Sequence, residues 1–186
     1  MNMLDFFVFS EDKRKTMKLL FVLLVASMVF VGCENQKEMS SINPVNWEKR
    51  TLRSTTPDSL LRKGSTYLSV YSEIYSESEH ATIDLTATVS LRNINQKDTI
   101  FIHKATYFNT HGEAIRNYFS KPIFIAPLET IEIIIDEKDK EGGSGANFIF
   151  DWSVSKGLHE PYFEAVMIST YGQQGISFTT RGIQIN

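Results

Sequence analysis

The 186-residue sequence contains a single cysteine, Cys33, and this scarcity excludes an internal disulfide framework. It also lacks long blocks of like charge, and its formal net charge is −3. Because nucleic-acid-binding domains usually carry a strongly basic surface, the sequence predicts no nucleic-acid partner. No two of the four histidines lie at a zinc-ligand spacing, and none is clustered with the cysteine. We therefore expect no metal and no cofactor.

The composition is that of a folded domain rather than of a disordered chain. Hydrophobic residues make up 42% of the sequence and aromatic residues 12%. This apolar content is sufficient to offset the conformational entropy lost on folding, and the length suits one domain with a short additional segment.

The N-terminal region has the pattern of an export signal. Residues 19–32 are uncharged and almost entirely apolar, and they follow four basic residues, Lys13, Arg14, Lys15 and Lys18. The run is shorter than the roughly 20 apolar residues that a spanning helix needs, and polar residues follow it. We predict a signal peptide over residues 1–32. Met17 resembles a normal signal start, so residues 1–16 are interpreted as a spurious extension from an upstream start codon.

The signal-like run ends in Phe30-Val31-Gly32-Cys33, which resembles the lipobox of bacterial lipoproteins. In a lipobox, a small residue precedes a cysteine that becomes the acylated N-terminus. Phe30 departs from the pattern, since leucine is usual at that position. The resemblance implies a lipid anchor on Cys33 in the cell envelope, and the competing interpretation is a simple buried thiol.

Two regions are expected after Cys33. Residues 33–66 are polar and contain Asn43-Pro44 and Thr56-Pro57, so we predict a tether there, with a short helix near residues 58–63 as an option. Residues 67–186 are predicted to form the folded domain.

Alternating apolar and polar residues in this domain predict antiparallel strands. The alternation is strict over residues 81–92, and it recurs in the segments that contain Ile131, Ile133 and Ile135, then Phe148, Phe150, Trp152 and Val154, then Phe163, Ala165 and Met167. Turn-forming residues separate the segments, and no long amphipathic helix is present. The pattern predicts an all-β fold, an antiparallel β-sandwich of immunoglobulin-like kind with about seven to eight strands.

Five blocks in the domain resemble one known family. They are Tyr71–Tyr75, Val89–Asn93, Gly142–Phe148, Glu164–Ile168 and Gln174–Phe178. In this order they are similar to the landmarks of the bacterial domain of unknown function 3124. The resemblance implies an exported, often lipid-anchored bacterial protein, and it implies no activity and no catalytic residues.

The glycine-rich stretch GGSGAN, residues 142–147, permits several interpretations. A phosphate-binding P-loop requires Gly-Lys-Ser/Thr, whereas Ala146 and Asn147 follow Gly145 here. A nucleophile elbow at Ser144 would need a strand before it and a helix after it. A bend between strands is favoured, ahead of a ligand-facing loop and, last, a nucleophilic serine.

The acidic residues before these glycines are candidate ligands for Ca²⁺. The candidate ligand loop comprises Asp136, Asp139, Glu141, Ser144 and Asn147. Its spacing does not match a calcium-binding EF-hand, and Lys138 and Lys140 alternate with the acids. A solvated loop that neutralises its own charge is therefore the favoured interpretation.

The remaining polar and aromatic residues favour structural roles. We expect His103 to be hydrogen-bonded within a strand and Glu164 to face Arg181 across two strands. Two or three of the tyrosines are expected at a surface for a partner or a glycan, and core filling explains the other aromatic residues.

The sequence therefore predicts a membrane-anchored lipoprotein of the cell envelope, a non-catalytic binding or assembly module. Its predicted partners are the membrane, through the lipid on Cys33, and an envelope protein or glycan. The alternative is an envelope enzyme or calcium-dependent ligand binder that uses the 136–147 loop, with His111 or His159 brought close by folding.

Overall fold

The computed structural model describes residues 45–52, 58–170 and 175–186, which belong to one compact unit, Met39–Asn186. The predicted signal peptide, Cys33 and the first part of the predicted tether lie outside the described residues. Three short 3₁₀ helices are present within them: η1 (Glu48–Arg50), η2 (Asp58–Leu60) and η3 (Gly143–Gly145). All other regular elements are strands, so the fold is all-β, as predicted.

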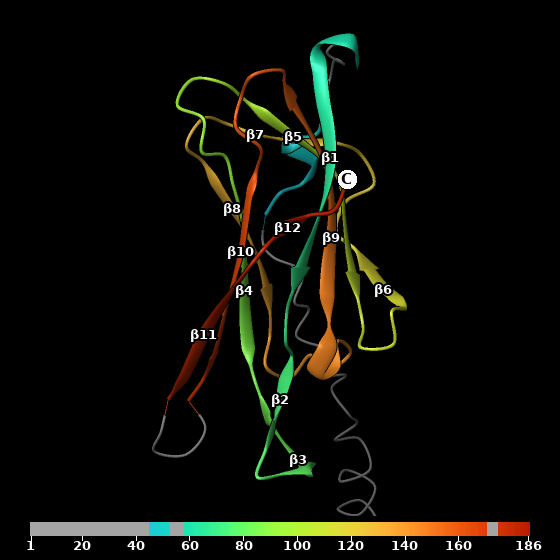
Figure 1. Cartoon of the computed structure of the whole chain (residues 1–186), viewed down its shortest axis with the longest axis vertical. Coiled ribbons are helices and arrows are strands. Elements are labelled where there is room, and N and C mark those ends of the chain that lie inside the picture. Colours follow the sequence, from blue (N-terminus) through green and yellow to red (C-terminus); the bar gives the residue numbers. More distant parts are fainter. Residues whose placement is uncertain (1–44, 53–57, 171–174) are drawn as a thin grey trace, which may run out of the picture. The chain divides into compact units, whose positions relative to one another are not determined.

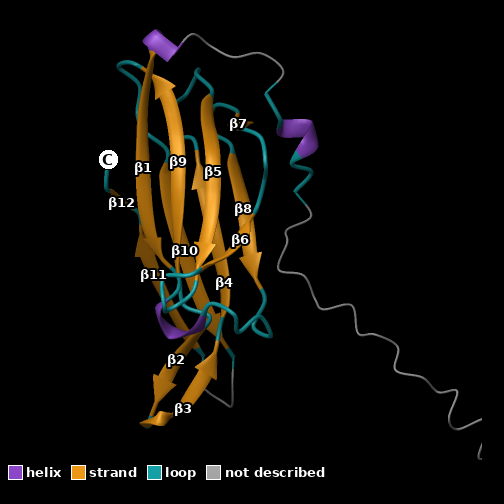
Figure 2. Ribbon diagram, turned by 90° about the vertical axis from the view of Figure 1, so that its right-hand side faces the viewer, coloured by secondary structure: helices purple, strands orange, loops and turns teal. Residues whose placement is uncertain are grey.

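One antiparallel sheet, called here the first sheet, has the strand order β12-β1-β9-β5-β6, and β7 also pairs with β5 (Figures 1 and 2). Its strands are β1 (Leu61–Ser69), β5 (Ile100–Phe108), β6 (Ala114–Asn117), β7 (Ile123–Ile125), β9 (Asn147–Ser155) and β12 (Ile183–Gln184). The central strand β9 pairs along its whole length with β1, from Leu61 opposite Ser155 to Ser69 opposite Asn147.

The second sheet has the order β11-β10-β4-β8, and all of its pairs are antiparallel. Its strands are β4 (Thr86–Arg92), β8 (Thr130–Ile135), β10 (Tyr162–Ser169) and β11 (Ile176–Arg181). A separate hairpin of β2 (Glu73–Ser76) and β3 (Ser78–Asp84) extends beyond one end of the two sheets (Figure 2).

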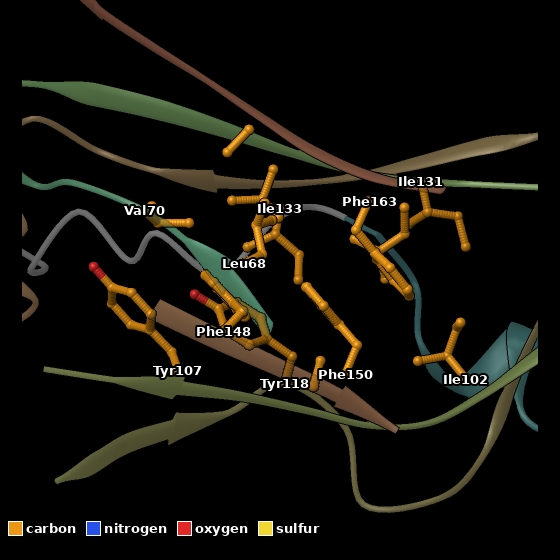
Figure 3. Packing of buried hydrophobic residues seen from close by; sticks show 14 of the residues in the cluster. Leu68, Val70, Ile102, Tyr107, Tyr118, Ile131, Ile133, Phe148, Phe150 and Phe163 are labelled. Carbon is orange, nitrogen blue, oxygen red and sulfur yellow. The ribbon is translucent and has the colours of Figure 1, made fainter. Parts of the chain in front are cut away.

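The core lies between the two sheets. Figure 3 shows Phe148 and Phe150 of the first sheet directed toward side chains of the second, including Ile133 and Phe163. The rings of Phe148, Phe150 and Phe163 stack in sequence, with centroids 5.2 and 4.3 Å apart. These side chains are buried because period-two alternation directs every second residue of each strand to the same face. The predicted antiparallel β-sandwich is confirmed.

Three details differ from the sequence prediction. The first strand begins at Leu61, so residues 61–66 belong to the sandwich and not to a tether, and residues 58–60 form a 3₁₀ turn. The alternating segment 81–92 is divided between β3 and β4, because the chain passes from the hairpin into the second sheet at the buried Leu85. Among the described residues there are twelve strands, more than the seven to eight predicted, because the short strands β2, β6, β7 and β12 have no clear signal in the sequence.

Candidate functional site

The glycine-rich segment forms a bend, as the favoured interpretation predicted. Gly143–Gly145 is a 3₁₀ turn between β8 and β9, and Asn147 is the first residue of β9. Thr110 holds the turn in two ways: its backbone N–H donates to the Gly142 carbonyl at 3.0 Å, and its hydroxyl accepts the Gly145 N–H at 2.9 Å. Backbone groups of Gly142, Gly143 and Gly145 are therefore bonded to protein.

Gly142 is required by a close approach of side chains rather than by its own backbone angles. A Cβ atom at this position would overlap the Tyr107 hydroxyl and lie 2.7 Å from the Ser72 hydroxyl. These two hydroxyls are 2.8 Å apart and share a buried hydrogen bond. Burial raises the pKa of Tyr107 above its ordinary value, which keeps the phenol protonated at neutral pH.

Two acids of the candidate ligand loop, Asp139 and Glu141, share one cation, whereas Asp136 accepts a backbone N–H. Arg116 of β6 donates to Asp139 at 2.9 Å and to Glu141 at 3.1 Å. Burial alone would lower the pKa of Arg116, but its hydrogen bonds to Tyr118 and Asp139 outweigh that effect and raise the pKa. The Asp136 carboxylate accepts the Lys138 N–H at 2.9 Å.

Charge balance in this loop differs from the expectation of self-neutralisation. Its acids are neutralised by Arg116 from another strand, and Lys140 reaches away to Asp84 of β3 at 2.8 Å. Within residues 45–52, 58–170 and 175–186, no group of three or more His, Cys, Asp or Glu side chains is arranged to hold a metal ion.

A groove of about 880 Å³ lies beside the loop and is lined by Glu137, Glu77 and Asp84, together with residues of the hairpin and Ser169–Thr170. None of the five candidate ligand residues lines this groove, and neither His111 nor His159 does so. The two histidines instead lie in turns whose backbone groups bond to Asn109 and Asn95 respectively.

His103 lies within β5 and its side chain is hydrogen-bonded, as predicted. Its Nε2 atom is 2.7 Å from the hydroxyl of Ser153, on β9. Ser153 is completely buried and so presents no hydroxyl to a substrate. The nearby carboxylate, Asp151, accepts a separate hydrogen bond from Ser65 at 2.6 Å. Since the Ser153 hydroxyl is buried, this cluster does not offer the accessible nucleophile that a Ser-His-Asp relay requires.

Glu164 lies directly opposite Arg181 in the β10–β11 register, as predicted. Glu164 forms an ion pair, however, with Arg92 on β4, the other neighbouring strand, at 3.6 Å. Arg181 lies over the ring of Tyr162, with 6.0 Å between the guanidinium carbon and the ring centroid. Among the tyrosines, Tyr107 and Tyr118 belong to the core, whereas Tyr75 on the hairpin is 63% exposed.

Residues 45–52, named here the N-terminal strap, pack against the β6–β7 region. The rings of Trp47 and Phe119 lie 5.2 Å apart. Thr51 forms a bridge with Ile123, and the Leu52 N–H donates to the carbonyl of Pro122 at 3.1 Å. The strap is thus a docked part of the domain, although its sequence is polar.

The strap forms one wall of a pocket of about 1070 Å³, named here the strap pocket. It is lined by Trp47, Glu48, Thr51, Leu52, His103, Lys104, Asn117, Tyr118, Phe119, Ser120 and Lys121. Sequence reasoning missed this site, because its members come from three separate segments. The one available signal was Trp47, a large aromatic residue inside a stretch interpreted as tether.

No helix within the described residues is both long and apolar enough to cross a bilayer.

Comparison with known proteins places the domain in a family. The solved structure described as "Crystal Structure of Thermotoga maritima 1070" is similar to 64% of this chain and 92% of that chain, with 10% sequence identity and a TM-score of 0.43. A comparison with curated proteins found no significant match. The family model described as "Protein of unknown function (DUF3124)" matches residues 63–185, and the chain therefore belongs to this family, as its five sequence blocks predicted.

Proposed function

We propose that this chain is a lipid-anchored, non-catalytic binding module of the bacterial cell envelope, held to the membrane through Cys33 and binding an envelope component in the strap pocket. The anchor is supported by the signal-like residues 1–32 and by the lipobox-like Phe30–Cys33. Tethering confines the domain close to other envelope components and raises their effective concentration, so weak contacts become sufficient for binding.

The strap pocket is the observation that carries the binding role. Its volume lies at the upper end of the range typical of small-molecule sites, and it combines aromatic, basic and amide side chains. A concave surface with a few convergent polar groups is the usual architecture of a ligand site.

The alternative function places a calcium-dependent or catalytic site in the 136–147 loop. The ion pairs of Asp139 and Glu141 with Arg116 argue against it, since a cation would have to displace the guanidinium group. The complete burial of Ser153, the serine that is hydrogen-bonded to His103, argues against serine catalysis at this position.

The test compares three forms of the tagged full-length chain in native membranes: the parent, Cys33→Ala and Phe119→Ala. We expect the parent to be found in the membrane fraction. The Cys33→Ala form should no longer be found there. After cross-linking, we expect a defined envelope component to co-purify with the parent and to be depleted with Phe119→Ala. Identical fractionation of parent and Cys33→Ala would refute the anchor. Undiminished capture by Phe119→Ala would refute binding in the strap pocket.

A further inference from the structure

We infer that the ligand of the strap pocket is a saccharide that carries carboxylate groups. This inference rests on the proposed binding function and specifies the chemical class of what is bound. Three properties of the lining support it: its charge, its aromatic rings and the direction of its hydrogen-bonding groups.

Charge is the first property. Lys104 of β5 and Lys121 of the β6–β7 connection both line the pocket and are exposed. Within the part of the chain that the structure describes, neither ammonium group has a hydrogen-bond or ion-pair partner. The only carboxylate in the lining is Glu48, so the pocket carries a positive excess on a chain whose net charge is −3. Such a local reversal of sign favours an anionic ligand.

The aromatic rings are the second property. Trp47 and Phe119 are each partly exposed and meet at an angle of 46°. Tyr118 also lines the pocket, although only 7% of its surface is exposed. Flat rings in an open pocket suit the apolar faces of sugar rings, whereas an acyl chain would need a continuous apolar lining. This pocket instead intersperses its rings with Asn117, Ser120 and the two lysines.

Hydrogen-bonding direction is the third property. The Oδ1 atom of Asn117 accepts the Thr106 hydroxyl at 2.7 Å, which leaves the amide N–H groups as its available donors. Together with Lys104 and Lys121, the pocket therefore presents mainly donors. An oligosaccharide with carboxylates and hydroxyl oxygens is rich in the matching acceptors.

The test is calorimetric titration of the full-length chain, in non-ionic detergent, with trigalacturonic acid as the acidic probe and cellotriose as the neutral one. We expect trigalacturonic acid to bind more tightly than cellotriose and to lose affinity as salt is raised, since exposed charges are screened. Lys104→Gln and Lys121→Gln should each weaken acidic binding by about three- to tenfold. Lys97→Gln, an exposed lysine outside the pocket, is the matched control and should leave affinity unchanged.

The other outcomes separate this inference from the proposed function. Equal binding of both trisaccharides, with no effect of either lysine variant, would overturn the acidic class. Binding to anionic phosphatidylglycerol vesicles through the two lysines, without binding of trigalacturonic acid, would overturn the saccharide. In either case the proposed binding function is retained if the capture of an envelope component depends on Phe119. If capture is independent of Phe119 as well, the proposed function itself fails.

Discussion

The two guanidinium nitrogens of Arg50 donate to the two carboxylate oxygens of Glu129, at 3.0 and 2.6 Å, although 79 residues separate them. Glu129 also accepts the N–H of Ala126 at 2.8 Å. The pair joins the strap to the turn before β8, and neither residue lines the strap pocket. Bidentate pairs of this kind are the strongest of the common ion pairs.

The first prediction concerns acid release of the strap. The hydrogen bond from Arg50 is the main cause that holds the pKa of Glu129 below its ordinary value of 4.5. A depressed folded pKa contributes stability that is present above the unfolded value and is lost as pH falls through the folded value. We therefore expect the strap to begin to detach as pH falls below 4.5 and to be released once pH has passed below the lower folded pKa of Glu129. A red shift in the fluorescence of Trp47 would report the detachment.

Two variants make this prediction specific. Glu129→Gln should show the shifted emission already at neutral pH, because the ion pair is absent. Trp47→Phe should remove the transition, since the other tryptophan, Trp152, is buried in the core. An unchanged spectrum of Glu129→Gln at neutral pH would contradict the role given to this ion pair.

The second prediction concerns Gly142→Ala. The added methyl group would overlap the Tyr107 hydroxyl and disrupt its hydrogen bond with Ser72, so we expect a loss of about 1–3 kcal/mol in the free energy of unfolding. Gly175→Ala is the control, since the nearest atom to a Cβ added there is the Ser169 carbonyl oxygen, at 3.9 Å. Urea unfolding of both variants would measure the difference. Equal stability of the two would refute the close-approach argument.

The third prediction concerns the stacked rings of the core. Phe150 lies between Phe148 and Phe163, and it is completely buried. Phe150→Ala should lower the free energy of unfolding by about 3–5 kcal/mol, because it removes a large apolar side chain and leaves a cavity. The partly buried Phe178 provides a comparison, and Phe178→Ala should destabilise the domain less. A larger loss in the free energy of unfolding for Phe178→Ala than for Phe150→Ala would contradict the central position of Phe150 in the core.

The fourth prediction concerns the acidic loop. Arg116→Gln leaves Asp139, whose side chain is 7% exposed, without its guanidinium partner, and we expect a loss of about 1–3 kcal/mol. Lys140→Gln removes an ion pair between exposed side chains and should not measurably change stability. Added Ca²⁺ should leave the thermal unfolding midpoint of the parent unchanged. A clear rise of that midpoint with Ca²⁺ would revive the calcium-dependent alternative.

Local alternation was sufficient to predict the sandwich. Phe148, Phe150 and Trp152 were assigned to the core from their period-two spacing, and all three are buried. The same holds for Ile131, Ile133 and Ile135. Alternation is a property of residues that are neighbours in the chain. It can therefore be recognised in the sequence without knowing which strands pair.

The strap pocket and the loop's ion pairs were not predictable in this way. Arg116 and Asp139 are 23 residues apart, and nothing in either local sequence indicates the other. Trp47 lies among polar residues in the sequence. Its place in the pocket lining becomes apparent only from its contact with Phe119 in the folded domain. Such pairings depend on strand order and register, which one sequence does not encode in any short-range pattern.

Docking of the strap also fixes how far the domain can travel from its proposed anchor. Between Cys33 and Val45 lie 12 peptide steps, which at about 3.5 Å each allow a span of roughly 40 Å. Were the strap released, the free linker would run to Leu61, and its maximum span would more than double to roughly 100 Å. If Cys33 is lipidated as proposed, the Arg50–Glu129 pair would limit how far the domain extends from the bilayer, because it keeps the strap docked.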